Sequence, residues 1–173
     1  LRESRKKPRE AMRRQAKTPI RRARILWGTA LTIEIADTRA EDLETVIGEA
    51  FADVERLTSI FSRYDRSSEI SRINSVGAYR PSTGRSAEFT RLLKLAMEMK
   101  DRTQGLFDPT WRRRDPAELD LDGIAKGYAV DRIVALFKRN GIEQALINFG
   151  ESSIAALGAP NGKAGWEIVV RDA

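Results

Sequence analysis

The sequence contains no cysteine and no histidine among its 173 residues. Without cysteine, these residues can form neither a disulfide nor a thiolate metal site, and this absence fits either redox compartment. Without histidine, they can supply neither an imidazole-based catalytic triad nor a histidine zinc centre. The sequence also lacks any run of about 18 apolar residues, the length that a membrane-spanning helix requires. Its length and its hydrophobic content of 41% favour one globular domain.

The net charge of +6 is concentrated at one end of the chain. Residues 1–24 contain 11 lysines and arginines against 2 acidic residues, whereas the remaining 149 residues carry a net charge of −3. We therefore expect residues 1–24 to form a solvated basic arm. Contact with a phosphate or with an anionic membrane surface is the alternative for this arm. No apolar run of about 7 to 15 residues follows the charges, so we do not expect a signal peptide here.

Hydrophobic periodicity predicts three helices. Apolar residues recur at spacings of three and four over residues 40–61, which predicts one long helix with a single buried face. The same pattern over residues 87–105, preceded by Ser86 as an N-cap, predicts a second helix. A third helix is expected over residues 125–139.

The remaining segments predict strands and one short helical turn. Alternating apolar residues over 25–35 indicate a half-buried strand, and Ser67 or Ser68 is expected to cap a short helical turn. Three further strands are expected at residues 144–150, 152–158 and 165–172. Together these elements predict an α+β fold with a mixed, largely antiparallel sheet packed with helices, formed by residues 25–173.

The segment LDLDGIAKGYAVDRI, residues 119–133, places two acids, a glycine and a lysine close to a helix start. Free N–H groups at a helix start favour negative charge, so Asp120 and Asp122 could simply cap the helix while Lys126 lies in solvent. The same groups could serve a nucleotide, because N–H groups and a lysine receive a phosphate while oxygen ligands face a hard cation. The residues alone leave both interpretations open.

This segment resembles the DLGGIAKGYAVD signature of the ApbE family, the FAD:protein FMN transferases, and other stretches match the family in the same order. WGTALTIEI is similar to its MGT strand, FSRYDRSSEISRIN to its LSxYxxxSExSRxN segment, and GLFDPT to its GxFDPT loop. Downstream, LINFGESSIAALGAP and GWEIVVRD are similar to its glycine-rich strand turn and to its GWxVxIRDP strand. The resemblance covers residues 25–173 and implies an α+β, T-fold-like architecture.

The resemblance also implies an activity and a set of site residues. A Mg²⁺-dependent transferase of this kind takes FAD as substrate and moves its FMN half to a threonine hydroxyl of an acceptor protein, releasing AMP. The residues implied to contact FAD are Trp27, Tyr64, Leu106, Phe107, Asp108, Asp120 and Lys126. The carbonyl of Gly123 would bind the metal, and Asn148 to Gly150 would form a wall. Two positions differ from the family pattern. Trp27 stands where the family has a methionine, and Glu151 stands at the second glycine of its glycine-rich strand turn. The resemblance assigns no catalytic residue.

Simpler roles exist for several of these residues. Tyr64 and Phe107 could be ordinary core or rim aromatics, Asp108 could begin a turn before a proline, and Ser68 with Ser71 could merely cap a helix.

The family pattern continues into an HxxDPxTG segment and a later Asp/Thr pair, which these 173 residues do not contain. Three explanations stay open: a fragment of a longer enzyme, which we favour, a truncated non-catalytic homologue, or half of a site that another chain completes. We expect these residues alone to bind flavin weakly and to transfer nothing.

Two functions of other classes remain as alternatives. One is a non-catalytic FAD-binding module, and the other is a nucleic-acid or membrane binder acting through residues 1–24, although specific nucleic-acid binding is not expected. The family resemblance implies a periplasmic or membrane-associated protein, whereas a chain without a leader would be cytoplasmic.

Overall fold

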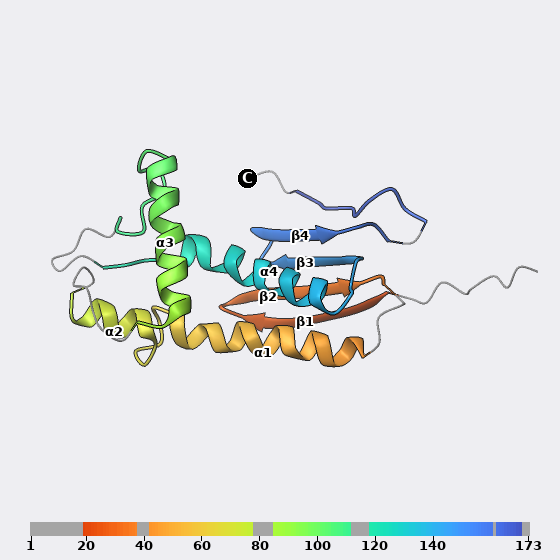
Figure 1. The fold of residues 1–173 in the computed structure, drawn as a ribbon, viewed down its shortest axis with the longest axis horizontal. Coiled ribbons are helices and arrows are strands. Elements are labelled where there is room, and N and C mark those ends of the chain that lie inside the picture. Colours follow the sequence, from red (N-terminus) through yellow and green to blue (C-terminus); the bar gives the residue numbers. More distant parts are fainter. Residues whose placement is uncertain (1–18, 38–41, 78–84, 112–117, 161, 171–173) are drawn as a thin grey trace, which may run out of the picture.

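The computed structural model describes residues 19–37, 42–77, 85–111, 118–160 and 162–170. These ranges contain the following elements in chain order: β1 (Ile20–Leu26), β2 (Thr29–Ile35), α1 (Leu43–Phe61), α2 (Glu69–Ser75), α3 (Ala87–Arg102), α4 (Asp122–Arg139), β3 (Ala145–Phe149) and β4 (Ser153–Leu157). They form the α+β fold that the sequence predicted (Figure 1). No helix within the described ranges has the length and apolar character required to cross a membrane.

The four strands form one sheet in the order β1-β2-β3-β4, and every neighbouring pair is antiparallel. Leu31 lies opposite Phe149 and Ile33 lies opposite Ile147, so the four side chains share one face of the sheet. All four are fully buried. Helices α1 and α4 pack on this face and complete the core (Figure 1).

Helix α1 owes its position to the apolar stripe that the sequence predicted. Its buried residues are Val46, Ile47, Ala50, Phe51, Val54, Leu57, Ile60 and Phe61. Burying an apolar side chain of this size contributes roughly 1.5–3 kcal/mol. The stripe therefore holds α1 firmly against the sheet, and the C-terminal end of α1 is fixed in place.

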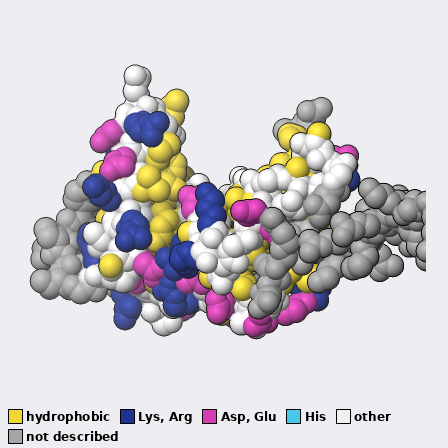
Figure 2. Space-filling model, turned by 45° about the vertical axis from the view of Figure 1, so that its right-hand side comes forward, with side chains coloured by type: hydrophobic (Ala, Val, Ile, Leu, Met, Phe, Trp, Pro, Cys, Tyr) yellow, Lys and Arg dark blue, Asp and Glu magenta, His cyan; other side chains and the backbone are white. Residues whose placement is uncertain are grey.

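Helix α3 projects from this body, as Figure 2 shows. Apolar side chains gather along the side of the projection that faces a hollow in the surface. The helix is anchored in the core by Phe89, Leu92 and Ala96. Phe89 packs against Phe61 with ring centroids 6.4 Å apart. As predicted, the Ser86 side chain accepts a hydrogen bond from the backbone N–H of Phe89 and caps the helix. The predicted Ser68 cap of α2 is confirmed in the same way.

The prediction of one strand over residues 25–35 is wrong. Trp27 and Gly28 have φ angles of 53° and 75°, and they form a two-residue turn between β1 and β2. Two successive residues in the left-handed region are typical of a type I′ hairpin turn, whose twist matches that of the strands. Alternating apolar residues on both sides of this turn resemble one continuous strand in the sequence.

The first strand begins at Ile20, inside the segment that we assigned to a basic arm. Two of its arginines form ion pairs with α1, which is compatible with a place in the sheet. Arg22 forms an ion pair with Glu44, and Arg24 forms one with Glu55 at 2.9 Å. Residues 20–24 therefore belong to the folded body, while residues 1–18 lie outside the described residues.

Two other boundaries differ from the prediction. Helix α4 begins at Asp122 rather than at residue 125. The described part of the expected strand at 165–172 is not a strand, and Val169 and Val170 are 85% and 84% exposed. The predicted strands at 144–150 and 152–158 are present as β3 and β4. An alternating apolar pattern forms a strand only where a neighbouring strand receives its backbone hydrogen bonds.

Candidate functional site

A cavity of about 440 Å³ opens where the β1–β2 turn, the end of α1 and the first turns of α4 meet. Its lining residues are Ile25, Leu26, Trp27, Thr58, Phe61, Ser62, Tyr64, Asp122, Ala125 and Lys126. Pockets for small ligands have volumes of about 300–1,000 Å³ and combine apolar walls with a few polar groups. Three of the predicted contact residues, Trp27, Tyr64 and Lys126, therefore meet in a cavity of suitable size and composition.

Trp27 forms a fixed aromatic wall of this cavity. Its indole N–H donates a hydrogen bond to the Thr58 hydroxyl at 2.8 Å, and its ring packs on Phe149 with centroids 5.2 Å apart. The expected wall at Asn148 to Gly150 therefore supports Trp27 from behind and does not line the cavity. Gly150 has a φ of 66°, and a Cβ at this position would lie 2.7 Å from the methyl group of Thr29.

Tyr64 lies at the mouth of the cavity, with 78% of its surface exposed. The neighbouring Arg63 donates a hydrogen bond to the Tyr64 hydroxyl at 2.6 Å and places its guanidinium 4.4 Å from the centre of the ring. Arg63 Nε also donates to the Asp122 carboxylate at 2.7 Å. This bond to Asp122 raises the pKa of Arg63. Arg63 therefore connects Tyr64 to the start of α4.

The start of α4 is compatible with both roles that the sequence left open, capping of the helix and binding of a nucleotide. Asp120 is buried, and its carboxylate accepts a hydrogen bond from the backbone N–H of Asp122 at 3.0 Å, which caps a free donor of the helix. Asp122 and Lys126 lie one turn apart and both line the cavity. The capping role holds for Asp120, whereas Lys126 lies in a position from which it could receive an anionic group.

The predicted Phe107 loop is held against the same helix start. The backbone N–H of Asp120 donates to the carbonyl of Pro109 at 2.8 Å. A Cβ on Gly123 would lie 3.2 Å from the ring of Phe107, so a side chain at this position would displace the ring. Phe107, Asp120 and Gly123 are therefore neighbours, and Asp122 links them to the cavity.

Four of the seven predicted contact residues do not line the cavity. Phe107 and Asp120 lie at the start of α4, as described above, and the other two are Asp108 and Leu106. The Asp108 carboxylate accepts hydrogen bonds from the backbone N–H and the hydroxyl of Thr110, and it pairs with Lys100 of α3 at 2.9 Å. The Thr110 hydroxyl and the Lys100 ammonium lower the pKa of Asp108 to about 2. Leu106 is 95% exposed, and neither residue lines the cavity.

Two residues that support the site were not among those predicted from the sequence. Asn74 exchanges two hydrogen bonds of 2.9 Å with the backbone of Leu119, directly before Asp120. The buried Glu69 accepts a hydrogen bond from the backbone N–H of Ser86 at 2.7 Å and holds the start of α3. Both residues lie in the SEISRIN stretch, which resembles the family segment. The stretch does not reveal their partners, Leu119 and Ser86, because these residues are distant in the sequence.

The model of the ApbE family matches residues 27–114 and 111–173. None of the curated proteins matches the chain. Among solved structures, the flavin transferase ApbE from Vibrio cholerae has a TM-score of 0.77 and 21% identity, covering 88% of this chain and 63% of its own.

Two further solved structures share the fold. The apo form of the flavinyl transferase ApbE from Pseudomonas stutzeri has a TM-score of 0.75 and 18% identity, covering 88% of this chain and 65% of its own. The ApbE protein from Thermotoga maritima has a TM-score of 0.77 and 23% identity, covering 90% of this chain and 64% of its own. The chain thus spans slightly less than two thirds of each of the three structures. Because the family model matches almost all of the chain after the basic residues, this protein belongs to the ApbE family.

Proposed function

We propose that this chain supplies the flavin-binding part of an FAD:protein FMN transferase. The observation that carries the proposal is the convergence of Trp27, Tyr64 and Lys126 on one cavity. Two aromatic rings offer surfaces on which the isoalloxazine could stack, and the lysine offers a positive charge for the diphosphate. The neighbouring structures from Vibrio cholerae and Pseudomonas stutzeri are a flavin transferase and a flavinyl transferase, which supports the same ligand.

In the proposed reaction, a threonine hydroxyl of an acceptor protein attacks the phosphorus of the FMN half of FAD. A new P–O bond forms to the threonine, the P–O bond to the AMP half breaks, and AMP leaves with the bridging oxygen. The hydroxyl proton passes to a base. These 173 residues contain no histidine, so a base among them would be another residue type. Phosphoryl transfer depends mainly on positioning and on neutralising negative charge, and Lys126 is the residue that we propose for that role.

The expected Mg²⁺ is not accounted for by the described residues. Among them, no group of three or more acidic, cysteine or histidine side chains could hold a metal ion. The proposed contribution of the Gly123 carbonyl would therefore require additional ligands, and we assign no reaction step to the metal.

Flavin binding can be measured directly by titrating FAD and following its fluorescence. We expect Lys126→Gln to weaken FAD binding by about 10-fold to 100-fold, because a charge-assisted hydrogen bond to phosphate contributes about 1.5–3 kcal/mol. Lys138→Gln is the matched control, since Lys138 lies on the same helix, is exposed and does not line the cavity. Equal affinities of the two variants would contradict the proposed role of Lys126.

Transfer is measured by incubating the protein with FAD, Mg²⁺ and a threonine-containing acceptor peptide. Mass spectrometry detects the added FMN, and chromatography detects AMP. For the 173 residues alone, we expect FAD binding without transfer, because they do not contain the HxxDPxTG segment and the later Asp/Thr pair of the family pattern. Flavinylated peptide together with AMP would show that these residues suffice for transfer. A failure to bind FAD would contradict the proposed function itself.

A further inference from the structure

Arg63 lies beside the cavity, where it contacts both Tyr64 and Asp122. We propose that Arg63 is a positioning residue that makes the cavity able to accept an anionic ligand. The inference rests on the proposed function, because the anionic ligand considered is the diphosphate of FAD. It depends on three observations: the charges around Arg63, its contacts with Tyr64, and the ion pair that joins its segment to that of Asp122.

The first observation is electrostatic. Arg63 Nε lies 2.7 Å from the carboxylate of Asp122 and 3.9 Å from that of Asp120. Asp122 lines the cavity, and Arg63 is the arginine that pairs with its carboxylate. Without this guanidinium, the carboxylate would present a negative charge to the ligand and would repel a diphosphate.

The second observation concerns Tyr64. Most of this side chain is exposed, so its own packing does not hold the ring in one orientation. Arg63 holds it through the hydrogen bond to its hydroxyl and through the contact of the guanidinium with the ring. A ring that is already ordered loses less side-chain entropy when a ligand binds. Arg63 therefore orders one wall of the cavity as well as compensating its charge.

The third observation is that the ion pair joins two separate segments beside the cavity. The Asp122 carboxylate extends from the start of α4 and pairs with Arg63, 59 positions away in the chain. An acid that faces a binding cavity without a counter-charge would weaken the binding of any anion, so the two residues act as a pair.

The test compares the FAD dissociation constants of four variants with that of the unmodified protein. Arg63→Gln is expected to weaken FAD binding by about 10-fold, and Arg63→Lys, which keeps the charge, by about 3-fold or less. In the double variant Arg63→Gln with Asp122→Asn, most of the lost affinity should return. Arg66→Gln is the matched control, because this exposed arginine lies in the same loop and should leave the affinity unchanged.

A fifth variant separates an electrostatic role from a purely structural one. If the ion pair merely held the fold together, Asp122→Asn alone would weaken FAD binding. Because this change removes a negative charge and leaves Arg63 in place, we expect it to keep or increase the affinity. Thermal melting would show whether each variant is folded.

The inference and the proposed function fail in different ways. The inference is overturned if Arg63→Gln binds FAD as well as Arg66→Gln does, if the double variant recovers nothing, or if Asp122→Asn binds more weakly. In those cases the unmodified protein would still bind FAD, and the proposed function would stand. If the unmodified protein binds no FAD, the proposed function fails and the inference fails with it.

Discussion

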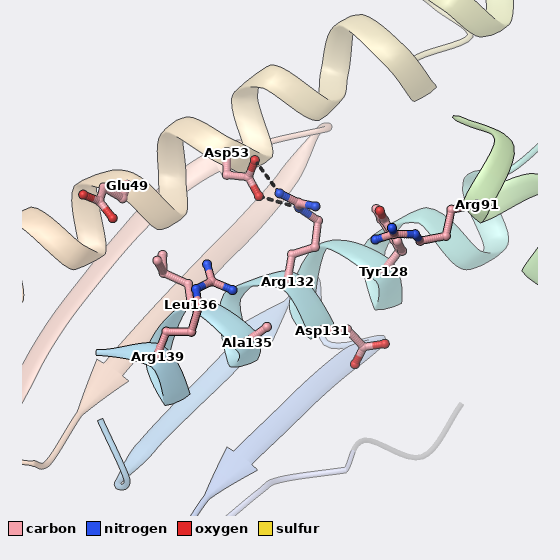
Figure 3. A pocket seen from close by; sticks show the side chains of 9 residues that line it. All are labelled: Glu49, Asp53, Arg91, Tyr128, Asp131, Arg132, Ala135, Leu136 and Arg139. Atoms are coloured by element: carbon pink, nitrogen blue, oxygen red, sulfur yellow. Dashed lines mark hydrogen bonds and ion pairs between the residues drawn. The ribbon is translucent and has the colours of Figure 1, made fainter. Parts of the chain in front are cut away.

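The ion-pair network between α1, α3 and α4 leads to a quantitative prediction for the substitution Arg132→Met. Arg132 of α4 donates to both carboxylate oxygens of Asp53 on α1, at 2.6 Å and 3.2 Å. It also lies 2.8 Å from Glu88 of α3. Figure 3 shows the Asp53 pair beside a cavity of about 430 Å³ between α1 and α4. Methionine would keep much of the side-chain volume and remove every one of these polar contacts.

The expected loss of stability lies between the values for surface and buried ion pairs. Exposed pairs contribute about 0–1 kcal/mol, and breaking a buried pair costs about 3–5 kcal/mol. The side chains of Arg132, Asp53 and Glu88 are 32%, 25% and 21% exposed. Arg56 still pairs with both acids after the substitution, which limits the penalty of leaving them without Arg132. We therefore expect a loss of about 2 kcal/mol.

The pKa of Asp53 is consistent with an ion pair that is stronger than a surface pair and weaker than a fully buried one. Burial alone would raise the pKa of the Asp53 carboxyl, but hydrogen bonds from Arg132 and Arg56 outweigh it and lower the pKa. The network therefore favours the charged form of Asp53 in the folded protein. Removing Arg132 removes the largest of these favourable contributions.

Urea unfolding followed by circular dichroism measures the change in the free energy of unfolding. Arg22→Met is the matched control, because the Arg22 and Glu44 side chains are 49% and 57% exposed and their pair should contribute at most about 1 kcal/mol. A loss of about 2 kcal/mol should lower the melting temperature by roughly 4–8 °C in a domain of this size. If Arg132→Met is no more destabilising than Arg22→Met, the reasoning that links partial burial to the strength of the network is wrong.

Two further predictions concern stability. Because the pKa of Asp108 is lowered to about 2, its stabilising contribution is present above the pKa of the unfolded chain and is lost as the pH falls from about 4 towards 2. Asp108→Asn should therefore lower the free energy of unfolding at pH 6, and the difference from the unmodified protein should shrink by pH 2.5; an equal difference at both values would contradict this assignment. Gly150→Ala should cost about 2–4 kcal/mol, because it combines an unfavourable left-handed alanine with a contact of 2.7 Å to Thr29. Gly141→Ala, with a φ of 69° and no atom within 4 Å of the added Cβ, should cost only about 1–2 kcal/mol, and equal losses in urea unfolding would show that Thr29 moves aside freely.

Local features of the fold were predictable from the sequence because they depend on neighbouring residues. The apolar periodicity of residues 40–61 and 87–105 predicted α1 and α3. The serines before α2 and α3 act as caps, since a hydroxyl three positions away reaches the free N–H of the first turn. The pattern of acids, glycine and lysine at residues 119–133 likewise marked a helix start.

Other features depend on partners that are distant in the sequence. Alternation over 25–35 could not show that Trp27 and Gly28 form a turn, nor that a basic segment before it pairs with β2. The apolar segment after residue 165 has the pattern of a strand and is not one. Strand formation requires a neighbouring backbone, and a sequence pattern does not reveal whether one is present.

The candidate site divides in the same way. The sequence by itself identified Trp27, Tyr64 and Lys126 through short stretches that resemble one family, and its composition excluded histidine and cysteine chemistry from these residues. Only the tertiary structure shows that the three side chains line one cavity. It also shows that Asp108 pairs with Lys100 of α3 and that Arg63 contacts both Tyr64 and Asp122. Residue types and local spacing are properties of the chain, whereas a binding cavity and its charge balance arise from contacts between segments that meet only after folding.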